Sequence, residues 1–432
     1  MFTELKVKIK KKKARLAVIG LGYVGLPLAV SFAKKGFKVI GIDTDYDRVA
    51  HIKRGISYIL DVTTAELKNV TRNRRLEATN NFRELSSCGV ILICVPTPLK
   101  RKYAPNISYI LEAVKNIQQY HQKGALIILE STTYPGTTEE VILPILEKKG
   151  KKCGRDFYLG FSPERIDPGN KVYSLTETPK VVSGVTRQCG ELVEILYQHI
   201  IKKVVRVSSP RVAETVKLLE NTFRIVNIGM INEMAMMCQK LKVDIWEVIE
   251  AAKTKPFGFM PFYPGPGVGG HCIPKDPLYL YWKAKRLGYP IKFIKLASDI
   301  NNHMPAYVVE RVRQILKKQN KNLKQARVLV LGATYKNDVK DLRKSPALDI
   351  IDRLLRTKVK VDYHDPYIPY LKFPHINLKS VALTKGNLAK FDCVVIATDH
   401  RCVNYNSILN NAKIIFDTRN VFKKPTRKVV KL

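Results

Sequence analysis

A strand that runs into a glycine-rich turn constrains the fold more than any other feature of the chain. The apolar segment LAVI (16–19) is followed by Gly20, Gly22 and Gly25, and then by a stretch with helical spacing. Here the first glycine permits a tight turn, the second lets the backbone approach a pyrophosphate, and the third allows close helix–strand packing. The sequence therefore predicts a Rossmann domain whose dinucleotide turn comprises Gly20, Leu21, Gly22, Tyr23, Val24 and Gly25.

Short β-branched segments alternate with segments of helical length through most of the chain. The first predicted strands are RLAVIG (15–20), KVIGID (38–43), VILICV (90–95), ALIILES (125–131), FYLGFS (157–162), KVVSG (180–184) and KVVRV (203–207). The alternation resumes at Arg327 with RVLVLG, KVKVDYHDP, DCVVIATD and KIIFDTRN. This pattern is typical of doubly wound parallel sheets, so we expect an α/β protein with two Rossmann-like domains.

The region between the two predicted sheets has helical periodicity. From Val212 to Lys240, apolar residues recur at helical spacing, which predicts one long helix. Further helices are expected over Ile245–Ala252, Pro277–Leu287 and Ile294–Leu316. We therefore expect a basic tail at 1–13, a Rossmann domain at 14–207, a central helical domain at 208–320 and a second Rossmann-like domain at 321–432.

The chain carries a large excess of positive charge, with 75 Lys and Arg residues against 37 Asp and Glu, a net charge of +38. Nucleic acid, an anionic membrane or acidic substrates are the partners that such an excess can indicate. No RNA-binding or zinc-finger pattern accompanies it, which favours lysine-rich solvated faces and no nucleic-acid partner. Seven of the first 15 residues are basic, and we expect Lys10–Lys13 to be a disordered lead-in or an electrostatic tether.

The cysteines and the hydropathy pattern lead us to expect a reduced, cytoplasmic protein. None of the eight cysteines forms a C-x-x-C pair, so the spacing predicts no metal site. The start of the chain has no signal-peptide pattern, and disulfides are not expected. No run of about 18 apolar residues occurs, so no membrane span is expected.

Residues that follow the predicted strands are candidates for cofactor contacts, because ligands of such sheets bind beyond the carboxyl ends of the strands. Asp43 ends the second strand, 18 residues after Gly25. An acid there accepts hydrogen bonds from ribose hydroxyls and repels a 2′-phosphate, which favours NAD over NADP. Arg48 is either an adenine or phosphate contact or a surface charge. The residues after the next strands are Val95, Pro96, Thr97, Pro98 and Thr132.

A loop at 264–276, with the sequence PGPGVGGHCIPKD, gathers glycines and prolines around a single cysteine. The glycines suggest a backbone that wraps closely on a ligand. Cys272 has His271 and Lys275 as neighbours, and cations there would favour the nucleophilic thiolate. The alternative is a buried packing cysteine, but such residues rarely occupy loops of this composition.

Several motifs together resemble one enzyme family, in the family's own order. They are GLGYVGLPLA, CVPTP, ESTTYPGTTEE, FSPERIDPGN, KLLENTFRIVNIGMINE, FMPFYPGPGVGGHCIPKDP and ATYKNDVKDLRKSPA. Over roughly residues 14–422 the chain resembles the UDP-glucose/GDP-mannose dehydrogenase family, and SPER and the cysteine loop look most like its UDP-N-acetylglucosamine 6-dehydrogenase branch. The resemblance implies that a sugar C6 alcohol is oxidised twice, to the carboxylate, by two NAD and without a metal.

The resemblance also implies an architecture and a biological role. Family members have two Rossmann-like domains joined by a long helix, the first binding NAD and the C-terminal one the UDP-sugar. They are usually homo-oligomers, dimers or larger, and the product would serve the synthesis of surface polysaccharide precursors.

The resemblance assigns roles in catalysis to six residues. Cys272 matches the nucleophile that forms a thiohemiacetal and then a thioester. Lys217 and Asn221 match residues that assist the alcohol and stabilise oxyanions, and Asp276 matches their partner acid. The base for thioester hydrolysis is matched by Glu164, and the hydroxyl that positions the water by Thr132.

The resemblance assigns further residues to binding. The cofactor set comprises Gly20 to Gly25, Asp43, Arg48, Val95 to Pro98 and Thr132, together with Lys275 and Arg343. The substrate set comprises Glu164, Arg165, Lys217, Asn221, Tyr263, Gly265, Gly267, Gly269, Lys336 and Arg419, with Arg343 also matching a sugar-nucleotide contact. Arg419 is the weaker match.

Three other functions compete with this interpretation. A UDP-glucose 6-dehydrogenase would share the motifs and differ in the sugar. A one-step hydroxyacid dehydrogenase has a similar layout but needs neither the cysteine loop nor the C-terminal sheet. A basic nucleic-acid-binding protein that retains an NAD fold would use the positive charge instead.

Overall fold

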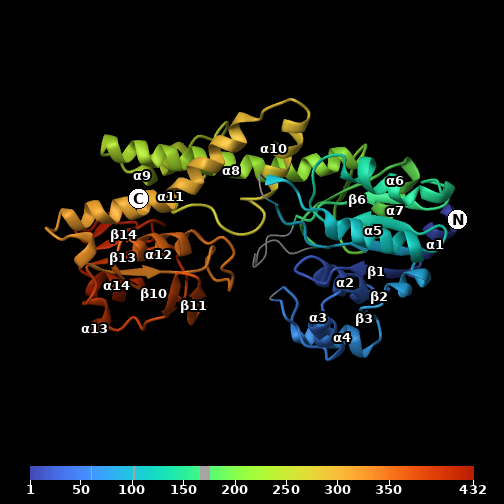
Figure 1. The fold of residues 1–432 in the computed structure, drawn as a ribbon, viewed down its shortest axis with the longest axis horizontal. Coiled ribbons are helices and arrows are strands. Elements are labelled where there is room, and N and C mark those ends of the chain that lie inside the picture. The colour runs from blue at the N-terminus through green and yellow to red at the C-terminus, as the bar shows by residue number, and fades with distance from the viewer. Residues whose placement is uncertain (60, 101–102, 166–175) are drawn as a thin grey trace. The chain divides into compact units, whose positions relative to one another are not determined.

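The computed structural model describes residues 1–59, 61–100, 103–165 and 176–432. These residues form two compact units. The first comprises residues 1–220 and 282–289, and the second comprises residues 221–281 and 290–432. Each unit is built on a β-sheet of its own (Figure 1).

The first unit contains an eight-stranded sheet in the order β3-β2-β1-β4-β5-β6-β7-β8. Its strands are β1 (Arg15–Ile19), β2 (Lys38–Ile42), β3 (Leu76–Thr79), β4 (Val90–Ile93), β5 (Leu126–Leu129), β6 (Tyr158–Phe161), β7 (Lys180–Gly184) and β8 (Val204–Arg206). Neighbouring strands are parallel, except that β6 and β7 pair antiparallel. The predicted doubly wound sheet is thus confirmed, with one reversed pair that the sequence pattern does not reveal.

Helices cover both faces of this sheet. They include α2 (Gly25–Lys34), α3 (Tyr46–Lys53), α4 (Thr64–Arg72), α5 (Ser108–Tyr120), α6 (Leu143–Leu146) and α7 (Arg187–Tyr197). Leu16 and Val18 of β1 pack in one apolar cluster with α2, α4 and α7, whereas Ala17 and Ile19 pack in another with α5. A strand covered on both faces appears in sequence as a continuous apolar run, which is why these strands were predictable.

The basic N-terminus is a helix that ends at Lys10, and the backbone N–H groups of Lys11, Lys12 and Lys13 donate to carbonyl oxygens of that helix, so the disordered lead-in predicted for Lys10–Lys13 is wrong. The electrostatic tether stays a prediction. Helix α1 (Phe2–Lys10) buries Leu5 and Ile9 in the cluster that contains α7. Lys6 forms an ion pair with Glu191 of α7. Two apolar side chains four residues apart lie on one face of a helix, and here that face docks on the sheet domain while the lysines stay in solvent.

The four helices predicted between the two sheets are confirmed, whereas their grouping into a separate domain stays a prediction. They are α8 (Pro210–Leu241), α9 (Ile245–Ala252), α10 (Asp276–Arg286) and α11 (Lys292–Lys317). Part of the apolar stripe of α8 is solvent-exposed, at Leu219, Phe223, Met230, Met234 and Met237. Among the described helices, even the longest lack the apolar length that a bilayer requires.

The second unit contains a five-stranded parallel sheet in the order β10-β9-β13-β14-β15. Its strands are β9 (Arg327–Leu331), β10 (Lys360–His364), β13 (Cys393–Ile396), β14 (Ile415–Asp417) and β15 (Val429–Lys431), and a hairpin is formed by β11 (Tyr370–Phe373) and β12 (Ile376–Lys379). Helices α11 and α12 (Pro346–Arg356) share an apolar cluster with one face of the sheet, and α13 (Lys385–Leu388) and α14 (Tyr405–Asn411) share one with the other. The second predicted Rossmann-like sheet is confirmed.

Candidate active site

The glycine turn at the end of β1 is shaped by its neighbours. Gly20 has a φ of +90°, and a Cβ added there would lie 2.8 Å from the Cys94 carbonyl oxygen. A Cβ at Gly25 would lie 1.8 Å from the Gly20 carbonyl oxygen, so the start of α2 can approach the turn only as glycine. A Cβ at Gly22 meets no atom within 4 Å. That open space adjoins the N-terminus of α2, which has no side-chain cap, and it fits a bound pyrophosphate.

Asp43 lies beside this turn. Its carboxylate accepts hydrogen bonds from the backbone N–H groups of Leu21 (2.7 Å) and Asp45 (3.0 Å). The Arg48 guanidinium lies 3.2 Å from Asp43 and 3.3 Å from Asp45. Arg48 thus forms ion pairs beside the predicted ribose position instead of being an isolated surface charge.

The predicted strand-end residues lie together. The Thr97 hydroxyl donates to the Thr132 carbonyl oxygen (2.8 Å), and the Ser131 hydroxyl donates to the Val95 carbonyl oxygen (2.8 Å). These contacts join the segment that follows β4 to the segment that follows β5. Carboxyl ends of neighbouring parallel strands meet at one edge of the sheet, as predicted.

A buried glutamate of α8, which the sequence analysis missed, anchors the loop after β5. Glu214 accepts hydrogen bonds from the backbone N–H groups of Gly136 (2.6 Å) and Thr138 (2.9 Å) and from the Thr138 hydroxyl (2.7 Å). Burial raises the pKa of Glu214 to about 7, although these donors oppose the shift. Thr132 is therefore held in a loop that is fixed from two sides.

Glu164 belongs to a second buried cluster of this unit. The Lys180 ammonium lies 2.9 Å from a Glu130 oxygen and 3.5 Å from a Glu164 oxygen. The Tyr197 hydroxyl donates to the other oxygen of Glu130. Burial raises the pKa of Glu130 to about 8. Glu130 and Lys180 are 50 residues apart in sequence, and no local motif links them.

Arg165 makes protein contacts of its own. Its guanidinium lies 2.6 Å from a Glu220 oxygen and donates to the Pro179 carbonyl oxygen (2.7 Å). A charge predicted to contact substrate is therefore already paired. Residues 166–170 of the FSPERIDPGN motif lie outside the described residues.

Helix α8 and the start of α10 bring two predicted catalytic residues together in the second unit. The Asn221 amide donates to an Asp276 carboxylate oxygen (2.7 Å), and both side chains are buried. Lys217 lies one turn earlier on α8, in the first unit, on the same helix face as Asn221.

Cys272 is exposed, in contrast to most of the other cysteines. Its carbonyl oxygen accepts hydrogen bonds from the backbone N–H groups of Lys275 and of Asp276, the first residue of α10. The Lys275 ammonium lies 3.2 and 3.3 Å from the two ring nitrogens of His271. Burial and the charges of Lys275 and Arg343 lower the pKa of His271 to about 4, so His271 is neutral at pH 7. The prediction of a cationic His271 beside Cys272 is wrong, whereas Lys275 remains a neighbouring amine.

The glycines of the cysteine loop face protein atoms. A Cβ at Gly265 would lie 2.9 Å from an Arg419 guanidinium nitrogen, and one at Gly269 would lie 2.5 Å from Tyr335 Cβ. A Cβ at Gly267, where φ is +130°, would lie 3.3 Å from the Pro346 ring. Packing against the C-terminal sheet region therefore requires small residues at these positions, and contact of the loop with a ligand stays a prediction.

Three other predicted substrate contacts are held in place by neighbours. The Tyr263 hydroxyl donates to Glu250 (2.8 Å). The Arg343 guanidinium lies 2.6 Å from an Asp341 carboxylate oxygen. The Arg419 Nε donates to the carbonyl oxygen of residue 397 (2.7 Å).

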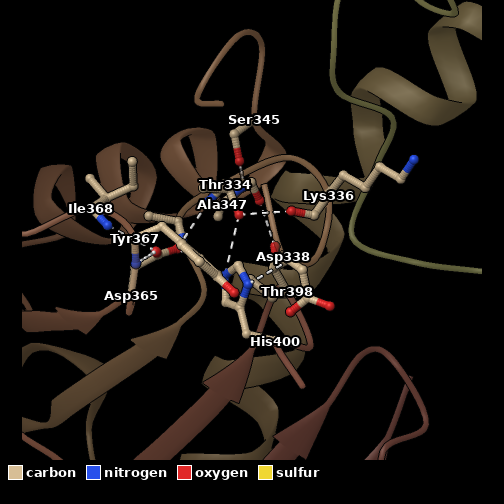
Figure 2. Close-up of polar contacts among 12 residues, drawn as sticks. Thr334, Lys336, Asp338, Ser345, Ala347, Asp365, Tyr367, Ile368, Thr398 and His400 are labelled. Carbon is tan, nitrogen blue, oxygen red and sulfur yellow. Dashed lines mark hydrogen bonds and ion pairs between the residues drawn. The ribbon is translucent and has the colours of Figure 1, made fainter. Parts of the chain in front are cut away.

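A buried network holds the loop that carries Lys336 (Figure 2). Asp338 donates its backbone N–H to Nδ1 of His400 (3.0 Å), so the ring proton is on Nε2, which lies 3.0 Å from an Asp365 oxygen. The Thr334 hydroxyl donates to the Lys336 carbonyl oxygen (2.9 Å). Figure 2 shows the Lys336 ammonium pointing away from this network. The sequence analysis missed His400, although it follows a strand end, as Asp43 does.

Models of three domains of one protein family match the chain in order. They are the NAD-binding domain at residues 14–201, the central domain at 211–303 and the UDP-binding domain at 329–424. The chain belongs to the UDP-glucose/GDP-mannose dehydrogenase family. It is an NAD-dependent UDP-sugar dehydrogenase, and the family's NAD-binding domain contains the glycine turn and Asp43, while its UDP-binding domain contains the His400 network.

Relatives of known name cover nearly the whole chain. The UDP-N-acetyl-D-glucosamine 6-dehydrogenase of Pseudomonas aeruginosa is 42% identical over 83% of this chain and 84% of that protein. The solved structure of UDP-D-ManNAc dehydrogenase from Pyrococcus horikoshii is 36% identical, with a TM-score of 0.87 over 96% of this chain and 98% of that one. The UDP-N-acetyl-mannosamine dehydrogenase structure from Staphylococcus aureus is 33% identical, with a TM-score of 0.81 over 97% of both chains.

Proposed function

We propose that this enzyme oxidises the C6 alcohol of a UDP-N-acetylhexosamine, with UDP-N-acetylglucosamine as the first candidate, to the uronic acid in two steps. The sugar is proposed from the relatives, whose names specify UDP-N-acetylglucosamine or UDP-N-acetylmannosamine. The observation that carries the two-step chemistry is the exposed Cys272 thiol at the start of α10, four residues before Asp276.

Two oxidations at one carbon require an intermediate that stays bound. The first step converts the C6 alcohol to an aldehyde, and the Cys272 thiolate adds to it as a thiohemiacetal. The second step removes the remaining C6 hydrogen as hydride and leaves a thioester, which water cleaves to carboxylate and thiolate. NAD, when bound, supplies the acceptor for the hydride in each oxidation.

The chain's own residues would move protons and stabilise charge in these steps. Lys217 and Asn221, on one face of α8, would stabilise the oxyanions. The hydrogen bond between Asn221 and Asp276 fixes the orientation of the amide. Glu164 would take a proton from the attacking water, and Thr132 would position that water.

The binding roles follow from the same matches. The cofactor set is proposed to contact NAD through the glycine turn, Asp43 and the strand ends, with Lys275 as a further contact. In the second unit, Lys336 and Arg343 would contact the nucleotide diphosphate, and Tyr263, Arg419 and the loop glycines would contact the remainder of the UDP-sugar. Arg165 would reach substrate only by leaving its ion pair with Glu220, which makes it a weaker candidate.

We also propose a homo-oligomer that works in the cytoplasm. Phe223, Met230, Met234 and Met237 expose a continuous apolar stripe along α8, and exposed apolar patches are characteristic of protein interfaces. The eight cysteines are free thiols, which supports a reducing compartment. A uronic acid product would suit the assembly of surface polysaccharide precursors.

The substrate proposal is tested by NADH production across a panel of UDP- and GDP-sugars. UDP-N-acetylglucosamine, or its manno or galacto epimer, should exceed UDP-glucose in kcat/KM by about 10-fold or more, because an acetamido group contributes roughly 1–3 kcal/mol of discrimination. Some activity on UDP-glucose is expected. A clear preference for UDP-glucose or GDP-mannose would reject the proposed substrate while leaving the family membership intact.

A further inference from the structure

A buried lysine on β7 adjoins the proposed base of the hydrolytic step. The side chains of Lys180 and Glu130 are 3% and 0% exposed, and that of Glu164 is 11% exposed. We propose that Lys180 is a positioning residue that holds and orients the Glu164 carboxylate for hydrolysis of the thioester, through its ion pair with Glu164 and its hydrogen bond to the Pro163 carbonyl oxygen. This inference rests on the function proposed above, and it adds a residue to which that function assigns no role.

The Lys180 ammonium faces two carboxyl groups, at 2.9 Å from Glu130 and 3.5 Å from Glu164. Burial would lower the pKa of Lys180, but these two acids raise it, so the lysine is a cation at neutral pH. Burial raises the pKa of Glu130, although Lys180 opposes that shift. Lys180 is therefore a buried cation within reach of the proposed base.

The start of β7 also fixes the segment around Glu164 mechanically. The Lys180 ammonium donates to the Pro163 carbonyl oxygen (3.3 Å), and the Ser162 hydroxyl donates to the Val181 carbonyl oxygen (2.8 Å). On the other side of Glu164, the Arg165 guanidinium donates to the carbonyl oxygen of residue 179 (2.7 Å). The position of the carboxylate thus depends on the segment at the start of β7.

Among the described residues, three titratable groups near this cluster are neutral or already paired. Arg165 is paired with Glu220 at 2.6 Å. Burial raises the pKa of the Cys94 thiol, which is therefore neutral. The Tyr197 hydroxyl donates to Glu130 and carries no charge at neutral pH. Loss of the ammonium would remove the ion pair of a Glu164 side chain that is largely buried.

The test compares Lys180→Met with wild type in the full-length enzyme, saturated with NAD and UDP-N-acetylglucosamine. Removing a cation at this distance should move the acid limb of the kcat–pH profile upward by about 1–3 pH units, with the rates converging above about pH 9. KM for both substrates should stay within about twofold, and intact-protein mass spectrometry at pH 6.5 should show the thioester accumulating. Lys180→Arg should restore much of the profile.

Lys6→Met is the matched control, because it removes an ion-paired lysine of the same unit whose partner is Glu191. It should leave the profile unmoved. A uniform loss of kcat at every pH in Lys180→Met, or an unshifted profile without thioester accumulation, would overturn the inference. If Lys180→Met does not fold, Lys180→Gln is measured instead. Misfolding of both variants beside a folded Lys180→Arg would assign Lys180 to sheet stability and also overturn it.

Failure of this inference is distinguishable from failure of the proposed function. If wild type makes no NADH with any UDP-sugar, the function fails. If wild type turns over and Cys272→Ala does not, while Lys180→Met keeps the wild-type profile, only the role of Lys180 fails.

Discussion

In each of the two sheets a glycine and an acid follow neighbouring strands in the same arrangement, here called the strand-end frame, and the two frames serve different purposes. In the first unit, Gly20 follows β1, and its N–H donates to the carbonyl oxygen of the residue before Asp43 (2.8 Å). In the second, Gly332 follows β9, and its N–H donates to the carbonyl oxygen of the residue before Asp365 (2.8 Å). Each acid accepts a hydrogen bond of 2.7 Å from the residue after its glycine. Both glycines have positive φ, at +90° and +81°.

The two frames differ in the segment that comes after the glycine. In the first unit α2 begins at Gly25, which leaves an uncapped helix N-terminus beside Asp43. In the second unit α12 begins only at Pro346, and a loop fills the interval. There Asp365 faces the buried ring of His400 (Figure 2). Its carboxylate also accepts hydrogen bonds from the backbone N–H groups of Ala333 and Thr334, at the start of the loop. One acid is left beside open space for a ligand, and the other is used to hold a loop.

The strongest disruption of the first frame is expected from Gly25→Ala. Its Cβ would lie 1.8 Å from the Gly20 carbonyl oxygen, a backbone atom that cannot yield without opening the turn. Unfolding free energy should fall by more than about 3 kcal/mol, and NAD binding should be lost.

Gly22→Ala is the matched control, because its Cβ meets no protein atom within 4 Å. The melting temperature of Gly22→Ala should stay within about 2 °C of that of wild type, while a titration should show weaker binding of NAD. Equal destabilisation by both substitutions would contradict this account of the turn.

The buried carboxyls of Glu214 in the first unit and Asp365 in the second should contribute to stability with opposite dependence on pH. The pKa of Glu214 is raised from 4.5 to about 7 by burial, so the folded state holds a proton that the unfolded state releases above pH 4.5. Its stability contribution is present below pH 4.5 and falls as pH rises to about 7, by at most about 3 kcal/mol. The urea concentration at the midpoint of unfolding should fall less steeply between pH 5 and 8 in Glu214→Gln than in wild type. An unchanged slope in that variant would show that Glu214 is not the titrating group.

Asp365 should respond with the reverse sign. Burial would raise its pKa, but the hydrogen bonds from His400 and from the Ala333 N–H outweigh burial and lower it. Its contribution is therefore present above the unfolded pKa of about 4 and is lost in more acidic solution.

His400→Ala should loosen the second frame without affecting the first. Asp338 would lose the acceptor for its N–H, and Asp365 would lose a donor, which costs about 2 kcal/mol of unfolding free energy. KM for the UDP-sugar should rise about tenfold, by analogy with other lost positioning contacts, while KM for NAD stays constant. His400→Asn, whose amide oxygen can replace Nδ1, should recover part of the loss. A rise in KM for NAD instead would contradict the division of roles between the units.

Asp43→Ala should reduce the preference of the first unit for NAD over NADP. Without the carboxylate, repulsion of a 2′-phosphate disappears and the nearby Arg48 can accept it. The ratio of kcat/KM for NAD to that for NADP should narrow by about tenfold, or roughly 1.4 kcal/mol. A wild type that uses both cofactors equally would refute the role of Asp43.

Sequence reasoning succeeded where structure depends on neighbours along the chain. Strands buried on both faces, such as β1, were found as apolar runs, but β3 was missed because Glu77 is exposed at the sheet edge. The helix α1 was missed because lysines surround its two buried apolar residues. At the site, the glycine turn, Asp43 and the pair Asn221–Asp276 follow from motifs.

The missed parts depend on contacts between distant segments. Glu130 and Lys180 meet only when β5 and β7 enter one sheet. The charge of His271 depends on burial and on Arg343, 72 positions later, so its position beside Cys272 in sequence was misleading. Motifs identify which residues are present, whereas packing decides their ionisation.

The covalent role of Cys272 is the central claim, and intact-protein mass spectrometry tests it most directly. Wild type should release two NADH per UDP-sugar. Cys272→Ala should bind NAD and the UDP-sugar almost normally but form almost no uronic acid. Cys272→Ser, mixed with NAD and UDP-N-acetylglucosamine, should gain the mass of a sugar nucleotide held as a slowly hydrolysed ester. Full turnover by Cys272→Ala at two NADH per sugar would contradict the account.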